Sequence, residues 1–143
     1  MIEKVISLIF PYAATTRVGT GAIIVRVAPR YLPDQSDPQA PRHVWSYHVR
    51  VENQSLETVQ LRARHWLITD AYGHVETVEG PGVIGQQPYI EPGAAFDYVS
   101  GCPLPTPSGT MQGHYHMTAE SGAFDVAVPA FALEHPTLKP SIN

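Results

Sequence analysis

Three glycines in the middle of the chain have the spacing of a nucleotide-binding motif. Gly80, Gly82 and Gly85 form G-x-G-x-x-G within the stretch EGPGVIGQQP. In that motif a strand ends at the glycines, which let the backbone approach a pyrophosphate, and a helix begins with its N-terminus directed at the anion. Here Pro88 and Pro92 follow the glycines, and they leave no room for a helix. The context therefore argues against a dinucleotide-binding fold.

The same stretch has a second interpretation that needs no helix. Consecutive loop N–H groups can bind an anion by themselves. The candidate loop for pyrophosphate or a nucleotide polyphosphate comprises Gly80, Gly82, Val83, Ile84 and Gly85, with Arg62 and Arg64 of the preceding segment as partners. The alternative, which the sequence favours, is a structural connection, because glycine permits the backbone angles that turns and bulges require.

Two histidines have the spacing of a partial metal site. His114 and His116 would lie on the same face of a strand, two residues apart, and such a pair can begin a divalent metal site. His48 and His65 are further candidates. No cysteine pair and no H-E-x-x-H segment completes a recognised site. The sequence favours the alternative, in which these histidines belong to a solvated strand face.

The residues Arg64, His65 and Trp66 form a candidate interaction surface. Arginine and tryptophan on an exposed strand are typical anchors of protein interfaces. Alternatively, Trp66 points inward and belongs to the core. The sequence does not decide between the two.

The sequence offers almost no residues in a recognised catalytic arrangement. The chain has no G-x-S-x-G segment and no Cys–His signature, and its carboxylates are scattered singly. Cys102 lies in SGCPLP without an adjacent basic residue that would lower its pKa. We therefore expect no catalytic residue, no enzyme activity and no cofactor.

The length and composition of the chain limit which classes of protein it can belong to. The chain has 143 residues, which suits one domain, with 43% hydrophobic and 15% charged residues. A net charge of -4 argues against general nucleic-acid binding, since phosphate neutralisation needs a cationic face. Cys102 is the only cysteine, so no intrachain disulfide can form, and the expected location is the cytoplasm. The apolar run at residues 5–10 is too short to insert in a membrane, and we expect it to be poorly ordered or an added edge strand.

The elements that must position these residues are strands. Short runs rich in Val, Ile, Tyr, Phe and Thr alternate with turn residues, and the predicted strands are residues 21–31, 43–52, 59–69, 74–79, 95–101, 110–119 and 123–131. Trp45, Tyr47, Val49 and Val51 share one face. The alternation shifts phase near Trp66, which predicts a bulge or a strand that changes its contacts. Pro and Gly in Glu91–Gly93 are placed for a type II turn, and CPLPTPSG is expected to be a long loop. Seven or eight antiparallel strands without helices indicate an all-β protein, an immunoglobulin-like or fibronectin type III-like β-sandwich; a partly closed barrel is the alternative.

Five blocks of the sequence together resemble the ApaG family. They are PRYLPDQSDP, YHVRVENQSLETVQLRARHWLITDAYG, EGPGVIGQQPYIEPG, SGCPLPTPSGTMQGHYHM and FDVAVPAFAL. The resemblance covers about residues 17–133, which gives an N-terminal extension at residues 1–16 and a tail at residues 134–143. It implies a fibronectin-like β-sandwich, in agreement with the predicted strands.

The resemblance implies less about function. The family has no established enzymatic activity, and a related domain in eukaryotic F-box proteins is thought to engage protein partners. Bacterial members are linked to cobalt resistance and magnesium efflux, and their G-x-G-x-x-G, here Gly80, Gly82 and Gly85, has prompted a suggestion of pyrophosphate binding. We therefore expect a non-enzymatic interaction domain with an unidentified protein partner. The alternative is a binder of pyrophosphate or a nucleotide polyphosphate. The resemblance does not extend to the His114 and His116 pair.

Overall fold

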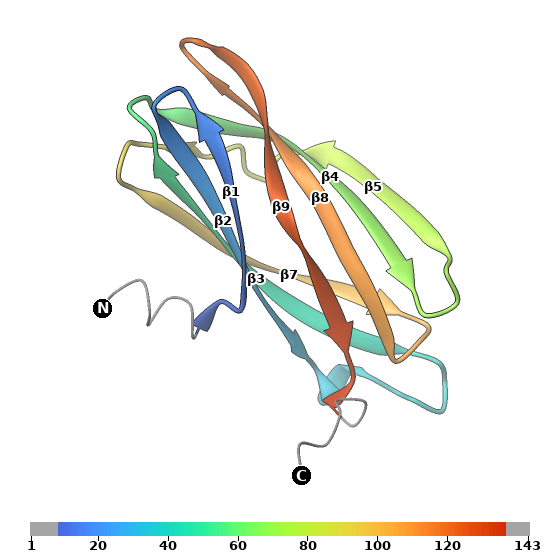
Figure 1. The fold of residues 1–143 in the computed structure, drawn as a ribbon. Helices are drawn as coiled ribbons and strands as arrows, with labels where there is room; N and C mark the ends of the chain where they lie inside the picture. Colours follow the sequence, from blue (N-terminus) through green and yellow to red (C-terminus); the bar gives the residue numbers. More distant parts are fainter. Residues whose placement is uncertain (1–8, 137–143) are drawn as a thin grey trace.

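A computed structural model describes residues 9–136 and contains nine strands within that range (Figure 1). The strands are β1 (Tyr12–Val18), β2 (Gly21–Tyr31), β3 (His43–Gln54), β4 (Val59–Asp70), β5 (Val75–Pro81), β6 (Tyr89–Ile90), β7 (Ala95–Leu104), β8 (Ser108–Ala119) and β9 (Gly122–Glu134). A single turn of 3-10 helix, η1 (Pro33–Gln35), interrupts the connection from β2 to β3. No helix in the described range is long and apolar enough to span a bilayer.

The strands form two antiparallel sheets that pack face to face. One sheet has the order β1-β2-β3-β7, and the other has the order β5-β4-β8-β9 with β6 paired to the start of β4. The layers are visible in Figure 1, where the blue and teal strands of the first sheet lie against the green and orange strands of the second. The predicted β-sandwich without a disulfide is confirmed.

The alternation of apolar residues is what builds the core between the sheets. The predicted inward face of β3, from Trp45 to Val51, is at most 6% exposed at its four apolar positions. Opposite it, Tyr115 of β8 is completely buried and shares a hydrogen bond with the hydroxyl of Tyr98 on β7. This hydrogen bond connects the two sheets across the core.

The predicted strand ranges agree closely with the observed ones, with differences at the ends. β2 has the predicted bounds, whereas β7 and β8 each extend into CPLPTPSG, which the sequence suggested was a long loop. The predicted turn at Glu91–Gly93 forms: Gly93 has φ of 82°, and the N–H of Ala94 donates to the carbonyl of Glu91 at 2.9 Å.

The start of the described chain contributes a strand that the sequence did not place. β1 begins at Tyr12, inside the stretch assigned to an N-terminal extension, and pairs with β2 over its whole length. The expectation for residues 5–10 falls largely outside the described residues; Phe10 is buried, and its ring packs against His48 at 4.7 Å between centroids.

The two sides of the sandwich end differently. On one side β1 meets β9: the N–H of Ala132 donates to the Tyr12 hydroxyl at 3.3 Å, and the N–H of Ala127 donates to the Thr16 hydroxyl at 3.0 Å. On the other side the edge strands are β5 and β7, and no hydrogen bond joins these two among the described residues. A cleft opens there between the sheets.

Candidate functional site

The glycine loop is a tight hairpin, in which the N–H groups of Gly82, Val83 and Gln86 have backbone acceptors. Ile84 and Gly85 both have positive φ, at 44° and 77°. The N–H of Val83 donates to the carbonyl of Gln86 at 2.8 Å, and the N–H of Gln86 donates back at 2.9 Å. These are the features of a type I′ turn. Val83 is 1% exposed and inserts into the core, which holds the hairpin against the sandwich.

Each glycine of the motif has a structural reason to lack a side chain. A Cβ at Gly82 would lie 2.0 Å from the carbonyl oxygen of Gln86, and Gly82 also has φ of 60°. A Cβ at Gly80 would lie 3.1 Å from Nη1 of Arg64, so the guanidinium packs directly on the glycine backbone. Gly85 supplies the second positive φ of the turn. The structural interpretation of the motif accounts for all three positions.

Of the two arginines predicted to bind the anion, Arg64 donates to carbonyl oxygens of the loop, and the side chain of Arg62 pairs elsewhere. Arg64 donates from Nη1 to the carbonyls of Pro81 at 3.1 Å and Gly82 at 3.0 Å, while Arg62 is exposed and bonds to Gln60. The N–H of Gly82 donates to the carbonyl of Arg62 at 2.8 Å. The loop thus directs carbonyl oxygens at the arginine, and this geometry gives the anion hypothesis no support.

His114 and His116 lie on the outer face of β8, as the alternation predicts. The hollow above them holds about 370 Å³ and is also lined by His65, Glu79 and Asp125. His65 Nδ1 lies 2.6 Å from Glu79 Oε1, and His116 Nδ1 lies 3.0 Å from Asp125 Oδ1. This face is polar and partly exposed, with its outer carboxylates paired to histidines.

The histidine face does not have the geometry of a metal centre. His65 and His114 stack with ring centroids 4.8 Å apart and planes at 17°, so their in-plane lone pairs run nearly parallel instead of converging. His48 lies on the other sheet, beside Asp97 at 2.8 Å. Within residues 9–136, no three His, Cys, Asp or Glu side chains are grouped to hold a metal ion. The metal site at His114 and His116 stays a prediction.

The three residues of the candidate interaction surface alternate between the two faces of β4. The β4–β8 register shifts between Leu61 and Ala63, a few residues before the phase change seen in the sequence. After the bulge Arg64 and Trp66 face the interior, and His65 faces out. Trp66 is 2% exposed and belongs to the core, which is the inward alternative. The three side chains therefore do not form one surface.

The cleft between β5 and β7, which sequence reasoning missed, collects several unusual groups. It holds about 270 Å³ and is lined on the sheet of β4 and β5 by Arg64, Trp66, Ile68, Glu76 and Val78, and on the rest of its wall by Tyr47, Ser100, Gly101, Cys102, Pro103 and Met111. We call it the inter-sheet cleft. The positions in β4 could have been found by continuing the alternation after the bulge, but the opening depends on which strands end the two sheets.

Cys102 lines this cleft as a protonated thiol. Burial raises its pKa to about 11, and the nearby charge of Glu76 adds to the rise. The thiolate is the nucleophilic form of cysteine, so the thiol is inert at neutral pH. This agrees with the sequence, which offered no basic neighbour.

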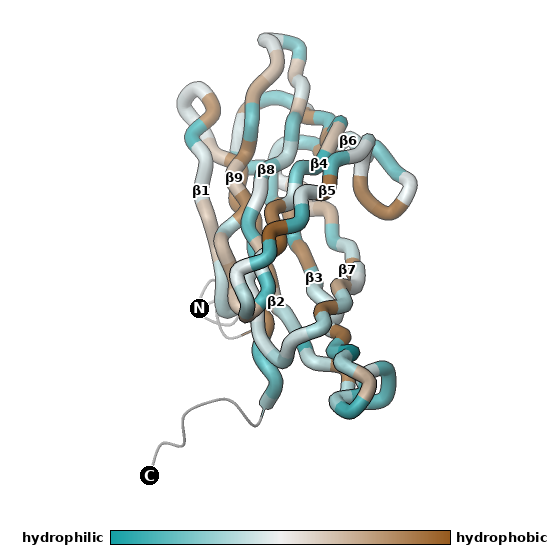
Figure 2. The backbone as a smooth tube through the Cα atoms, turned by 90° about the vertical axis from the view of Figure 1, so that its right-hand side faces the viewer, coloured by the Kyte–Doolittle hydropathy of each residue, from teal (hydrophilic) through white to brown (hydrophobic). Residues whose placement is uncertain are grey.

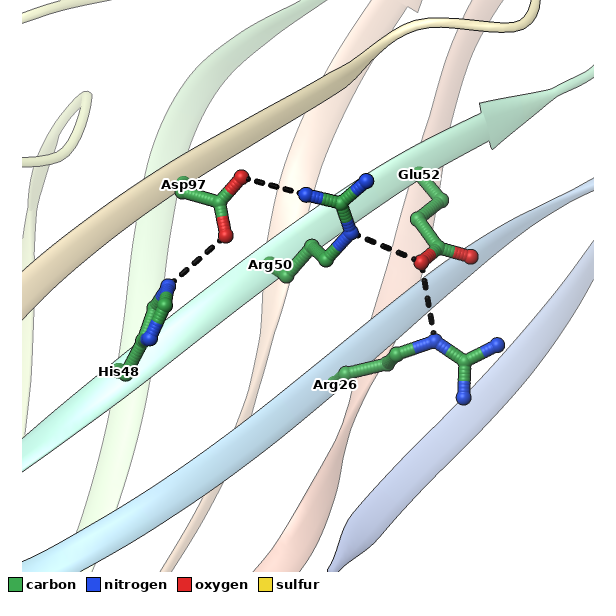
Figure 3. A network of polar contacts seen from close by, with 5 residues as sticks. All are labelled: Arg26, His48, Arg50, Glu52 and Asp97. Carbon is green, nitrogen blue, oxygen red and sulfur yellow. Dashed lines mark hydrogen bonds and ion pairs between the residues drawn. The ribbon is translucent and has the colours of Figure 1, made fainter. Parts of the chain in front are cut away.

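The outer face of the first sheet carries a network of charges that satisfy one another (Figure 3). Arg50 donates to Asp97 at 2.8 Å and to Glu52 at 3.0 Å, and Arg26 donates to the same Glu52 oxygen at 3.0 Å. His48 completes the row beside Asp97. Every cation in this row has a carboxylate partner, and the network has the character of a structural surface.

A third hollow, of about 400 Å³, lies near Tyr31 and Trp45, at the end of the β1–β9 side. It includes Pro11 and Pro136, which are close to both limits of the described residues. The indole Nε1 of Trp45 donates to the carbonyl of Glu134 at 3.0 Å. This indole donor is therefore already used.

Comparison with known proteins places this architecture in one family. The ApaG domain model matches residues 33–119. The chain is 59% identical over 118 residues to Protein ApaG of Rhodospirillum centenum, covering 82% of this chain and 91% of the relative, and 54% identical over 133 residues to Protein ApaG of Paramagnetospirillum magneticum, covering 92% and 99%. A crystal structure of an ApaA protein from Bordetella pertussis is 47% identical with a TM-score of 0.80, covering 84% of this chain and 98% of that one. The sequence resemblance is thereby confirmed, and the chain belongs to the ApaG family.

Proposed function

We propose that this protein is a non-enzymatic interaction domain that binds a partner protein along β5. The observation that carries the proposal is the distribution of exposed apolar side chains. Of the seven large ones exposed in the described range, four lie along β5 and its flanks: Tyr72, Val75, Ile84 and Tyr89. Val75 lies opposite Thr69 and Tyr89 lies opposite Gln60 at the other end of β4, so the four side chains are distributed along one sheet edge, where an extended partner could contact them.

The edge of β5 offers a partner backbone hydrogen bonds as well as apolar contacts. β5 pairs with β4 on one side and ends its sheet on the other. An extended peptide can add to such an edge through its main chain, with side chains giving specificity. Figure 2 shows the loop between β5 and β6 projecting from the sheet with a hydrophobic (brown) stretch, next to where an added strand would lie.

The absence of enzyme activity is part of the proposal. Its support is chemical: the Cys102 thiol stays protonated because its pKa is raised to about 11 by burial and by Glu76, and His65 and His116 each lie against a carboxylate on an open face. Neither histidine is placed next to a nucleophile that it could activate.

The experiment places a photoreactive benzoyl-phenylalanine at Thr77, which is exposed in the middle of β5, and at Thr15, which is exposed on the β1 edge. Irradiation in cells should give one defined adduct from the Thr77 position and none from the Thr15 position. The adduct should be lost with Val75→Asp, whose melting temperature should match the wild type because Val75 is 58% exposed. Equal adducts from both positions, or none from Thr77, would contradict the proposal.

The other functional expectations have no supporting contact in the described residues. Pyrophosphate or nucleotide polyphosphate binding at the glycine loop, regulation of divalent cations and the cytoplasmic location stay predictions. Calorimetric titration with pyrophosphate tests the first of these directly; we expect no heat of binding, since the N–H groups of Gly82, Val83 and Gln86 already have acceptors.

A further inference from the structure

The inter-sheet cleft has walls suited to an apolar group of limited size. Trp66, Ile68 and Met111 form buried parts of the wall, and Val78 is partly buried above them. Its volume of about 270 Å³ has room for roughly nine water-sized groups. Pockets for drug-sized ligands hold about 300–1,000 Å³, so the size favours a small molecule over a nucleotide polyphosphate.

One buried donor in the wall of the cleft lacks an acceptor. The indole Nε1 of Trp66 is the buried side-chain nitrogen or oxygen without a hydrogen-bond partner in the described residues. Its ring makes edge contacts with Tyr47, Tyr115 and Phe131, and none of these supplies an oxygen to it. A buried donor without an acceptor is destabilising, so a ligand that accepts this bond gains affinity there.

The second unusual group is the guanidinium of Arg64, a cation that has no carboxylate partner among the described residues. Arg64 is half-buried, and its recorded partners are two neutral carbonyls, those of Pro81 and Gly82. Arg26 and Arg50 on the first sheet, by contrast, each pair with a carboxylate (Figure 3). A guanidinium has five N–H donors, and the recorded bonds of Arg64 use only Nη1. The remaining donors suit a carboxylate.

The charge of Arg64 acts on the interior of the sandwich. Burial raises the pKa of Tyr47, and the positive charge of Arg64 is one of the influences that oppose this rise. Arg64 and Trp66 stand two residues apart on the inward face of β4. Both residues line the cleft, which places them among the donors that an acceptor group bound there would meet.

We propose that the inter-sheet cleft binds a small carboxylic acid with an apolar body. Its carboxylate accepts hydrogen bonds from Arg64 and from the indole of Trp66, and its body packs between Val78 and Met111. Glu76 sets the orientation, because it lies on β5 four residues from Gly80, the residue beside Arg64; this separation is roughly 13 Å along a strand. The carboxylate therefore occupies the Arg64 end, away from Glu76.

The test uses ¹⁵N-labelled protein and 3-phenylpropionate. The two tryptophans give two indole N–H signals, which Trp66→Phe assigns. Addition of 3-phenylpropionate should shift the Trp66 signal, since its N–H gains an acceptor, and should leave the Trp45 signal in place, since that N–H already donates to Glu134. The neutral 3-phenylpropanamide should bind at least tenfold more weakly because it lacks the charge.

Two substitutions test the role of the cation. Arg64→Gln should weaken 3-phenylpropionate binding at least tenfold, and Arg62→Gln, which removes an exposed arginine from the same strand, should leave it unchanged. Trp66→Phe should weaken binding severalfold without unfolding the protein. A Trp66 signal that does not move at millimolar 3-phenylpropionate, or equal affinity of Arg64→Gln and wild type, would overturn the proposal. Loss of the β5 adduct described above would not affect it, because the two sites have different readouts.

Discussion

The edge strands of the two sheets are joined by hydrogen bonds on one side of the sandwich and are separated by a cleft on the other. On the β1–β9 side, backbone N–H groups of β9 donate to the hydroxyls of Tyr12 and Thr16, and the ring of Tyr12 lies 6.0 Å from that of Phe131. On the β5–β7 side the sheets separate around the inter-sheet cleft, and Trp66 is left with an unused donor. An exposed edge invites association with other chains. The first side therefore contributes contacts that hold the sheets together, and the second is the side at which we propose that binding occurs.

The largest expected effect comes from a substitution in the glycine loop, which follows the edge strand β5. Gly82→Ala should lower the free energy of unfolding by about 3 kcal/mol, because φ of 60° strains an alanine and its Cβ would overlap the Gln86 carbonyl. Gly85→Ala is the matched control: it has φ of 77° but nothing within 4 Å of the added carbon, so it should cost about 1 kcal/mol. Urea unfolding measures both, and equal losses would contradict the contact with Gln86.

The second prediction concerns the β1–β9 side of the sandwich. Tyr12→Ala removes the ring from Phe131 and the hydroxyl from the N–H of Ala132, and should cost about 2 kcal/mol. Tyr89→Ala removes the same side chain from a position that is 71% exposed beside β5, and should change the stability by less than about 0.5 kcal/mol. Similar losses for the two tyrosines would remove the distinction between the sides.

A smaller effect compares the two tryptophans directly. Trp45→Phe leaves the Glu134 carbonyl without its donor, whereas Trp66→Phe removes a donor that had no acceptor. Both substitutions lose similar ring volume, so Trp45→Phe should be about 1 kcal/mol more destabilising than Trp66→Phe. Chemical denaturation of both variants measures this difference. The reverse order would show that the Trp66 indole has an acceptor in solution.

The smallest effect concerns the thiol in the cleft. Burial and Glu76 raise the pKa of Cys102 to about 11 from 9.0, so iodoacetamide should alkylate the folded protein much more slowly at pH 8 than N-acetylcysteine. The folded state keeps the proton while the unfolded state loses it, so this contribution to stability is complete below pH 9 and is lost as the pH rises towards 11. Cys102→Ala should lack this component of the pH dependence. Rapid alkylation of the folded wild type would contradict the burial.

The sequence predicts the fold well because alternation is a local signal. The four apolar residues of β3 and the turn at Glu91–Gly93 both follow from neighbouring residues, and the structure confirms both. β1 escaped prediction since its alternation is weak: its residues are half-buried or exposed throughout. It is held in place by the adjacent β2 and by β9, whose contacts with β1 join residues 111 and 120 positions apart in the chain.

The candidate sites were harder to predict for a related reason. The phase change in β4 indicates a bulge, but its position, between Leu61 and Ala63, depends on the register with β8. That register decides that Arg64 and Trp66 share the interior while His65 lies outside. The inter-sheet cleft depends further on β5 and β7 ending their sheets, an arrangement set by contacts far apart in the chain.

The bulge in β4 sets a rule for changes in chain length. Arg62 is the extra residue, since Leu61 lies opposite Met117 and Ala63 lies opposite His116, the next residue of β8. Deleting Arg62 would therefore make the pairing regular and leave the side chains from Ala63 to Asp70 on their present faces. The loss of a residue elsewhere in β4 would instead exchange the faces of the side chains between that point and the bulge or the strand end. Among descendants of this sequence, the bulge is thus the place where β4 can lose one residue and still keep Trp66 and Ile68 in the core.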